Sequence, residues 1–244
     1  MINKVLKDHY ERKYANEYKA TPIESIDITN SPISRYEAVM KYFPLYFNGG
    51  DILEVGAGNG YVANSLLMSK QNVASYSLGD ISLPRVEGIR KNINDKRVFV
   101  SQVDVENIAE SEYGKYDAVI MIALIEHLID PMRAMKQIKN LIKPGGFVYL
   151  DTPNIAKYTQ RLKLLFGRFP STASKNEGLT TFSGEATDLF DEGHLHYFTY
   201  RSLSLMLTER CGYSKVVKLA YPGGRTPLGK NIHNLLSLKW PEMF

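Results

Sequence analysis

The stretch LEVGAGNG, Leu53–Gly60, places three glycines within five positions directly after a hydrophobic run. Such a turn lets the backbone approach a ligand closely where a helix begins. The glycines follow a G-x-G-x-G spacing, and Tyr61 stands where a dinucleotide-binding loop has its last glycine. No lysine followed by serine or threonine closes the loop, which excludes a phosphate-cradling P-loop. The loop therefore predicts a nucleoside ligand that carries no pyrophosphate.

Two carboxylates accompany the loop. Glu54 comes just before it, where a negative charge would repel a pyrophosphate and attract a cationic group of the ligand. Asp80 comes about 20 residues after the loop, at the end of the next apolar run, where it could accept hydrogen bonds from ribose hydroxyls. S-adenosylmethionine is a nucleoside without phosphates that carries a sulfonium and an ammonium group, so it suits both carboxylates.

Alternating apolar runs and helix-like stretches must position these residues. We expect strands at 51–55, 72–78, 97–104, 116–124 and 147–153, and helices at 61–70, 83–92, 131–142 and 200–211. This alternation predicts an α/β fold, a Rossmann-like, doubly wound, mostly parallel sheet with helices on both faces. In such a sheet the ligand lies at the carboxyl ends of the strands.

The chain is expected to form one domain over residues 1–244 with four parts. These are an N-terminal helical cap at 1–33, a cofactor-binding core at 34–153, an acceptor-side insertion after the fifth strand at 154–199, and a C-terminal helix, strand and tail at 200–244. Tyr10, Tyr14 and Tyr18 recur at helical spacing in the first part, where they could form a lid or pack on the core. The stretch 213–221 is expected to be a sixth strand, and nothing after it reads as a seventh.

Six stretches in fixed order carry a resemblance to a known family: LEVGAGNG, SLGDIS, QVDVEN, YDAVIMIALIEHLIDP, LIKPGGFVYLDTPN and GHLHYFTYRSLSLMLTERCGY. Over roughly residues 35 to 222 the chain resembles class I S-adenosylmethionine-dependent methyltransferases of the small-molecule subgroup, type 11/12/23-like. The resemblance implies that the methionine part of the cofactor is surrounded by Glu54, Gly56, Ala57, Gly58 and Gly60.

The same resemblance assigns the rest of the cofactor. It implies that Asp80 binds the ribose hydroxyls and that Ile81 lies against the adenine. Asp104 would bind the adenine amino group, with Val105 beside it. Met121 and Ile122 would lie beneath the reacting methyl group. Asp104 has an alternative role as a turn residue at the end of its strand.

A hydroxyl acceptor needs a base for its proton, and histidine titrates in the suitable range. The candidates are His127, which follows the fourth predicted strand, and His194 and His196 in the stretch DEGHLHYFTY. Each could face the acceptor or hold its loop. The pair His194 and His196 lies beside Asp191 and Glu192, which raises the question of a metal, but we expect none.

The composition limits the compartment and the partners. The single cysteine, Cys211, excludes an internal disulfide and a multi-cysteine metal site, so we expect a cytoplasmic protein. No apolar run reaches the ~18–20 residues of a membrane span. The stretch YTQRLKLLFGRF in the insertion is basic and amphipathic, so it could cap the acceptor pocket, which we favour, or lie on a membrane surface. The missing seventh strand leaves a sheet edge through which the protein could form a homo-oligomer.

These observations favour one function over three alternatives. We expect methyl transfer from S-adenosylmethionine to a small-molecule acceptor, at a hydroxyl of a sugar, a lipid-linked or another metabolite, with S-adenosylhomocysteine as product. The first alternative is a non-catalytic S-adenosylmethionine-binding module that serves another enzyme. An NAD-dependent enzyme is disfavoured by Tyr61 and Glu54. A nucleic-acid substrate is not expected, because no Asn-Pro-Pro-Tyr-like signature follows the fourth predicted strand.

Overall fold

The computed structural model describes residues 4–15, 25–26, 28–69, 71–109, 115–173, 177–178, 190–223 and 229–244. The chain forms two compact units. The first unit comprises Met1–Asn30, Tyr36–Ile122 and Arg133–Leu150, and the second comprises Ser31–Arg35, Ala123–Met132 and Asp151–Phe244. Each unit is thus assembled from segments that are separated in sequence. The predicted division of a single domain into four consecutive parts stays a prediction.

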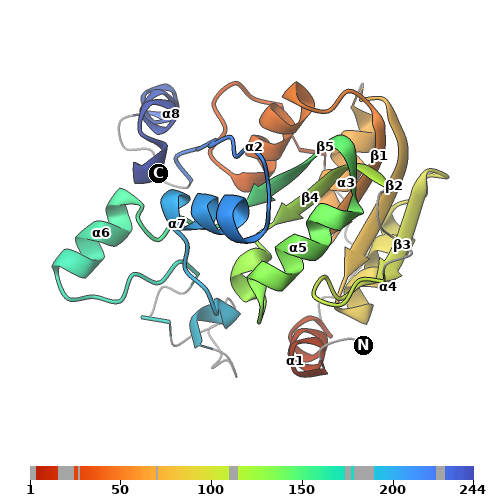
Figure 1. The fold of residues 1–244 in the computed structure, drawn as a ribbon, viewed down its shortest axis with the longest axis horizontal. Coiled ribbons are helices and arrows are strands. Elements are labelled where there is room, and N and C mark those ends of the chain that lie inside the picture. The colour runs from red at the N-terminus through yellow and green to blue at the C-terminus, as the bar shows by residue number, and fades with distance from the viewer. Residues whose placement is uncertain are drawn as a thin grey trace. The chain divides into compact units, whose positions relative to one another are not determined.

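A five-stranded sheet in the order β3-β2-β1-β4-β5 is the centre of the first unit (Figure 1). Its strands are β1 Gly50–Val55, β2 Val73–Asp80, β3 Val98–Gln102, β4 Tyr116–Ile122 and β5 Ile142–Asp151. Strand β1 pairs in parallel with β2 and with β4, and β2 pairs in parallel with β3. Val55 is in register with Gly79 and with Met121, so the carboxyl ends of the three central strands meet at one edge. The predicted parallel sheet is confirmed.

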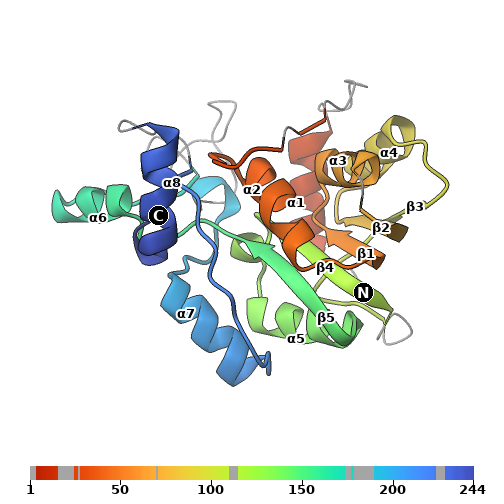
Figure 2. The ribbon, with the colours of Figure 1, turned by 90° about the horizontal axis from the view of Figure 1, so that it is seen from above.

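Helices cover both faces of this sheet, as predicted. Figure 2 shows α3 (Tyr61–Met68) and α4 (Leu83–Asn92) on one face and α5 (Pro131–Leu141) on the other. Two further helices, α1 (Lys4–Tyr14) and α2 (Arg35–Tyr42, followed by the 3-10 turn Phe43–Leu45), precede the sheet in sequence. On α5 the side chains of Ala134, Ile138 and Leu141 are completely buried. Their spacing is that of one helical face, which explains why α5 packs on the sheet.

The second unit holds short helices and long connections. Its elements are the 3-10 turns Ile125–His127 and Phe190–Gly193, the helices α6 (Tyr158–Leu165), α7 (Tyr200–Leu205) and α8 (Lys230–Lys239), and the 3-10 turn Pro241–Met243. Helix α7 continues as a single π-helical segment, Met206–Arg210, so the predicted helix at 200–211 is present with a widened last turn. Among the described residues no helix is both long and apolar enough to cross a membrane.

The predicted sixth strand at 213–221 is wrong, because these residues form no strand in the structure. Two carbonyl groups that a strand would use for pairing accept hydrogen bonds from side chains instead. The Tyr200 hydroxyl donates to the Leu219 carbonyl, and the Ser237 hydroxyl donates to the Ala220 carbonyl at 3.3 Å. Ala220 is buried. These contacts hold the stretch as an extended connection within the second unit.

Candidate active site

The glycine loop joins β1 to α3 in the conformation that its sequence requires. Gly58 and Gly60 have φ angles of +57° and +79°, in the left-handed region that glycine adopts without strain. A Cβ atom at Gly60 would lie 2.8 Å from Cδ1 of Ile93, so a larger residue would clash as well. Helix α3 begins at Tyr61 directly after this glycine. The loop thus brings the backbone of the strand end directly to a helix start.

Asp80 lies against this loop. Its Oδ2 accepts a hydrogen bond from the Gly58 amide at 3.1 Å, and its Oδ1 accepts one from the Ser82 amide at 2.9 Å. Burial raises the pKa of the Asp80 carboxyl, and the positive charge of Arg85 acts in the opposite direction. A carboxylate has further lone pairs for hydroxyl donors. The structure therefore brings together the two features that the sequence assigned to the nucleoside.

Glu54, in β1, is buried to 3% exposure. Tyr76 on the neighbouring strand β2 donates a hydrogen bond to Glu54 Oε2 at 2.7 Å. Burial raises the pKa of Glu54 to about 8, and the negative charge of Asp80 adds to the rise. Two buried carboxyls that repel one another and have few donors are a suitable environment for a cationic ligand group. The carboxyl groups of Glu54 and Asp80 therefore fit the ammonium group and the ribose hydroxyls of S-adenosylmethionine.

The other predicted cofactor residues have local roles in the structure. Asp104 Oδ1 accepts from the Glu106 amide at 3.0 Å and its Oδ2 accepts from Asn107 Nδ2 at 2.8 Å. These contacts are those expected of a turn residue at the end of a strand, which is the alternative role of Asp104. Val105 and Met121 are buried, and Ile81 and Ile122 are half-buried. Their contact with a cofactor stays a prediction.

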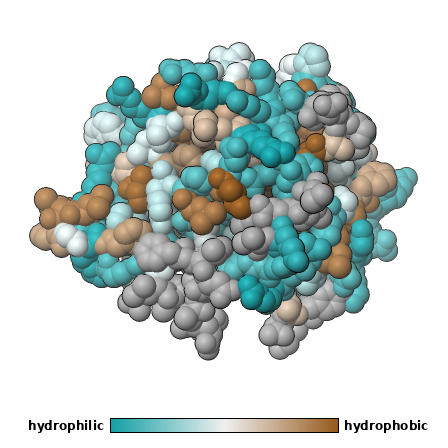
Figure 3. Space-filling model, turned by 60° about the horizontal axis from the view of Figure 1, so that its bottom comes forward, coloured by the Kyte–Doolittle hydropathy of each residue, from teal (hydrophilic) through white to brown (hydrophobic). Residues whose placement is uncertain are grey.

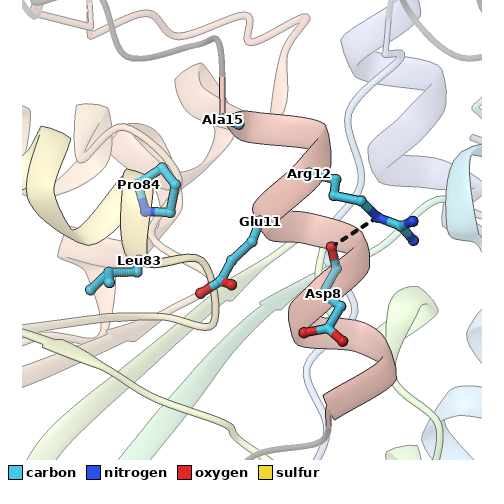
Figure 4. Close-up of a pocket in the computed structure, with 6 residues that line it drawn as sticks. All are labelled: Asp8, Glu11, Arg12, Ala15, Leu83 and Pro84. Atoms are coloured by element: carbon cyan, nitrogen blue, oxygen red, sulfur yellow. Dashed lines mark hydrogen bonds between the residues drawn. The ribbon is translucent and has the colours of Figure 1, made fainter.

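Helix α1 packs beside α4 in the first unit. The Arg85 guanidinium carbon lies 3.4 Å from the centre of the Tyr14 ring, and Tyr10 and Tyr14 stack with ring centres 5.9 Å apart. Tyr18, the third tyrosine of the predicted stripe, lies outside the described residues. An open depression of about 670 Å³ lies between the two helices (Figure 4); its lining residues are Asp8, Glu11, Arg12, Ala15, Leu83 and Pro84. None of the predicted cofactor residues lines this depression, which is formed by α1 and the start of α4.

Two of the three candidate histidines lie together in the second unit. The rings of His127 and His194 meet edge to face with centres 4.6 Å apart. His127 Nδ1 is 2.9 Å from the Gly193 carbonyl oxygen, and His194 Nδ1 is 2.7 Å from the Thr172 hydroxyl. His196 lies apart from them, 3.4 Å from the Ile129 carbonyl oxygen and stacked on Phe198.

Glu126 is a residue of this cluster that sequence reasoning missed. It is 1% exposed, and burial raises its pKa to about 7, although the positive charge of Arg35 acts against the rise. Thr152 donates to Glu126 Oε2 at 2.9 Å, and Oε1 is buried with no hydrogen-bond partner among the described residues. The signal was present: an acidic residue stands next to His127 directly after a buried strand.

Asp191 and Glu192, the acidic residues considered beside His194, have a different role. Both are buried with positive φ angles of 48° and 61°. The Asp191 carboxylate accepts hydrogen bonds from the Ser171 hydroxyl, from the Thr172 amide at 3.3 Å and from the Tyr197 hydroxyl at 2.9 Å. Asp191 therefore fixes the backbone that carries His194.

Comparison with known families now gives the class of the protein. A family model described as "Methyltransferase domain" matches residues 32–217, which is more than half of the chain. The protein belongs to this family and is a class I S-adenosylmethionine-dependent methyltransferase by family, as the glycine loop and its carboxylates predicted. S-adenosylmethionine is the methyl donor of the family.

Particular relatives cover part of the chain. The ubiquinone biosynthesis O-methyltransferase of Acinetobacter baumannii (strain ACICU) is 31% identical over 108 residues, 43% of this chain and 45% of the relative. The protein of the same name from Nitrosospira multiformis is 32% identical over 106 residues, 43% of this chain and 44% of the relative. The matched part therefore spans less than half the length of these relatives.

Solved structures support the fold. A protein of Bacillus halodurans C-125 described as a methyltransferase has a TM-score of 0.53 at 17% identity, over 70% of this chain and 67% of that one. A SAM-dependent methyltransferase of Thermotoga maritima has a TM-score of 0.52 at 18% identity, over 84% of this chain and 79% of that one. The predicted Rossmann-like fold is thereby confirmed.

Proposed function

We propose that this protein transfers a methyl group from S-adenosylmethionine to an oxygen atom of a small molecule, with S-adenosylhomocysteine as product. The observation that carries the proposal is the bond between the Gly58 amide and Asp80, beside the buried Glu54, at the carboxyl edge of the sheet. The names of the curated relatives, which act at oxygen, support a hydroxyl acceptor. The sugar or lipid-linked nature of the acceptor is part of this proposal.

S-adenosylmethionine supplies a methyl group on a sulfonium, which is an excellent leaving group. The residues of this chain therefore have to bind the cofactor and the acceptor, orient them toward one another, and exclude water. Asp80 would accept the ribose hydroxyls, and Glu54 would receive the ammonium after giving up its proton. The acceptor hydroxyl must also lose a proton. His127 and His194 are the better placed of the three predicted candidates, because their rings converge while His196 lies apart.

Calorimetry with S-adenosylmethionine tests the cofactor site. We expect Asp80→Ala to weaken binding at least tenfold and Gly58→Arg to abolish it, because the positive φ angle of Gly58 disfavours a side chain and the arginine would fill the loop. Glu87→Ala, a change at an exposed residue of helix α4, is the control and should bind like the wild type. Unchanged binding in both site variants would overturn the proposal. Binding without any labelled product from cell extracts would favour a non-catalytic binding module.

We further propose that the acceptor is met at an anionic membrane surface. Helix α6 has no buried residue, and apolar side chains at its end are exposed: Leu162, Leu164, Leu165 and Phe166, the last two by 74% and 75%. Figure 3 shows apolar residues projecting where Figure 1 places α6. Arg161, Lys163 and Arg168 surround them in sequence, which is the pattern of a peripheral membrane contact. This exposure favours the membrane over the cap that we preferred from sequence.

Vesicle sedimentation separates these two roles of α6. We expect binding to vesicles that contain phosphatidylglycerol, weaker binding in high salt, and at least tenfold loss in the double variant Leu165→Ser, Phe166→Ser. Leu45→Ser, which changes a leucine of similar exposure (69%) in the first unit, should bind like the wild type. If the double variant binds equally well, or if the wild type fails to bind, α6 is not a membrane contact.

A further inference from the structure

A group of three side chains in the second unit has the composition of a metal site. One ligand atom each from Glu126, His127 and His194 lies within 4.8 Å of the other two. Glu126 and His127 are adjacent in the 3-10 turn after β4, and His194 follows the turn Phe190–Gly193. Glu126 Oε1 is buried with no hydrogen-bond partner among the described residues. A buried carboxylate oxygen of this kind requires a proton or a cation.

The surroundings of the three side chains are those of metal ligands. His127 Nδ1 faces the Gly193 carbonyl at 2.9 Å, and His194 Nδ1 faces the Thr172 hydroxyl at 2.7 Å. Because a carbonyl oxygen only accepts, His127 donates through Nδ1 and keeps its lone pair on Nε2, the usual arrangement of a ligating histidine. The Thr172 hydroxyl can accept from His194 Nδ1 in the same tautomer. Thr152 fixes the second oxygen of Glu126 by a hydrogen bond of 2.9 Å. All three ligand groups are thus oriented through their outer atoms.

The backbone holds the two contributing segments together. The amides of Leu195 and His196 both donate to the Glu126 carbonyl oxygen, at 2.8 Å and 3.0 Å. The His194 amide donates to the Asp191 carbonyl oxygen at 3.0 Å, and the Asp191 side chain is itself fixed by three hydrogen bonds. The group is therefore a preformed feature of the fold and does not depend on long flexible side chains.

We propose that Glu126, His127 and His194 bind one divalent transition-metal ion. Two imidazoles and one carboxylate form a ligand set that suits Zn²⁺ and related first-row ions, and three protein ligands leave a position open. Ligand atoms at about 2.0–2.2 Å from one ion lie roughly 3–4 Å apart, so small side-chain rotations would close the site. We expected no metal from the sequence, where the pair His194 and His196 was considered. The proposed site instead takes two ligands from the turn after β4.

The ion would take part in the proposed methyl transfer, and this role rests on the proposed function. A hydroxyl oxygen bound in the open position would be polarised and its pKa would fall, so that its proton could pass to solvent water. The oxygen would then form its bond to the methyl carbon while the bond from that carbon to the sulfonium breaks and S-adenosylhomocysteine leaves. His127 and His194 would then act as ligands instead of as separate bases. Glu126 follows Ile122, the end of β4, by four residues along the chain.

Zinc titration of the chelator-treated, untagged protein tests the site in the absence of the methyl donor. By calorimetry and elemental analysis we expect one Zn²⁺ per chain. Glu126→Gln keeps the shape of the side chain and an oxygen for Thr152, and it should weaken binding at least tenfold, as should His194→Gln. His196→Ala, a histidine two residues away from the site, is the matched control and should bind one Zn²⁺ like the wild type.

The outcomes separate this inference from the proposed function. Absence of Zn²⁺ binding, or equal binding in the wild type, Glu126→Gln and His194→Gln, would overturn the metal site. A rise of melting temperature with Zn²⁺ in the wild type and in His196→Ala, but not in the two folded ligand variants, would support it even if one variant were unstable. Zn²⁺ binding without any S-adenosylmethionine binding would overturn the proposed methyl transfer and leave the metal site standing.

Discussion

At the scale of single residues, Glu54 connects burial with acidity. Burial raises its pKa from 4.5 to about 8. Between these values the folded protein keeps a proton that the unfolded chain releases, so the stabilising effect of the proton is complete below pH 4.5. It is lost as the pH rises through 8.

We expect Glu54→Gln to become more stable relative to the wild type as the pH rises from 5 to 8.5. Glutamine has no proton to lose and can still accept from Tyr76, so the difference should grow by roughly 1–4 kcal/mol. Urea unfolding at pH 5, 7 and 8.5 measures it. Glu87→Gln on the exposed side of α4 should show no such trend. A constant difference for Glu54→Gln would mean that its pKa is ordinary.

Gly60 offers a second test at this scale, because its backbone and its surroundings both exclude a side chain. Gly60→Ala should destabilise the protein by about 1–3 kcal/mol, from the positive φ angle and the contact with Ile93. At Gly88 in α4, an added Cβ atom would have no neighbouring heavy atom within 4 Å. Gly88→Ala should therefore be neutral or stabilising by up to about 1 kcal/mol. Thermal unfolding compares them, and similar melting temperatures for both variants would refute the strain at Gly60.

The sequence predicts some site residues far better than others. The glycine loop and Asp80 could be found because a strand, a tight turn and a helix start follow one another directly, and the meeting of Gly58 with Asp80 follows from parallel pairing of β1 and β2. The meeting of Glu126 with His194 could not be found, since it depends on how a long insertion returns to the turn after β4. The local sequence pattern does not predict where the insertion brings His194 relative to Glu126.

At the scale of elements, helix α7 begins with a capping box. The Ser202 amide donates to the Thr199 hydroxyl at 3.0 Å, and the Thr199 amide donates to the Ser202 hydroxyl at 3.0 Å. Each bond satisfies an amide that the first helical turn leaves without a partner.

We expect Thr199→Ala to lower the free energy of unfolding by about 1 kcal/mol, and Thr199→Ser to retain most of the stability. Thr208, whose hydroxyl donates to the Ser204 carbonyl within the helix, caps no end. Thr208→Ala is the control and should lower the free energy of unfolding by less than about 0.5 kcal/mol. Denaturant unfolding gives these values. A loss at Thr208 as large as that at Thr199 would show that the box does not stabilise the start of α7.

The elements also show where a sequence pattern is ambiguous. Helix α4 was predicted with its observed bounds, Leu83–Asn92, because proline at its first turn marks the start. The stretch 213–221 was predicted as a strand but forms none, since hydroxyls of Tyr200 and Ser237 donate to carbonyl groups that a neighbouring strand would need. A short apolar run therefore does not show by itself that its backbone will pair with a neighbouring strand.

At the scale of the whole molecule, the sheet order ends at β5, and no further strand follows it among the described residues. We therefore keep the prediction of a homo-oligomer that pairs through this edge. Sedimentation velocity over a hundredfold range of concentration should show a dimer that dissociates on dilution. A single monomeric species at every concentration would contradict it. The cytoplasmic location expected from the single cysteine likewise stays a prediction.

The proton on buried Glu54 has a consequence for the heat of ligand binding. If the ammonium group of S-adenosylmethionine takes its place near pH 7, each binding event releases up to one proton into the solvent. The buffer then takes up that proton with its own enthalpy of ionisation. The calorimetric heat measured in phosphate should therefore differ from that in Tris, and the difference should vanish in Glu54→Gln. The choice of buffer thus becomes a means of counting the protons that Glu54 exchanges.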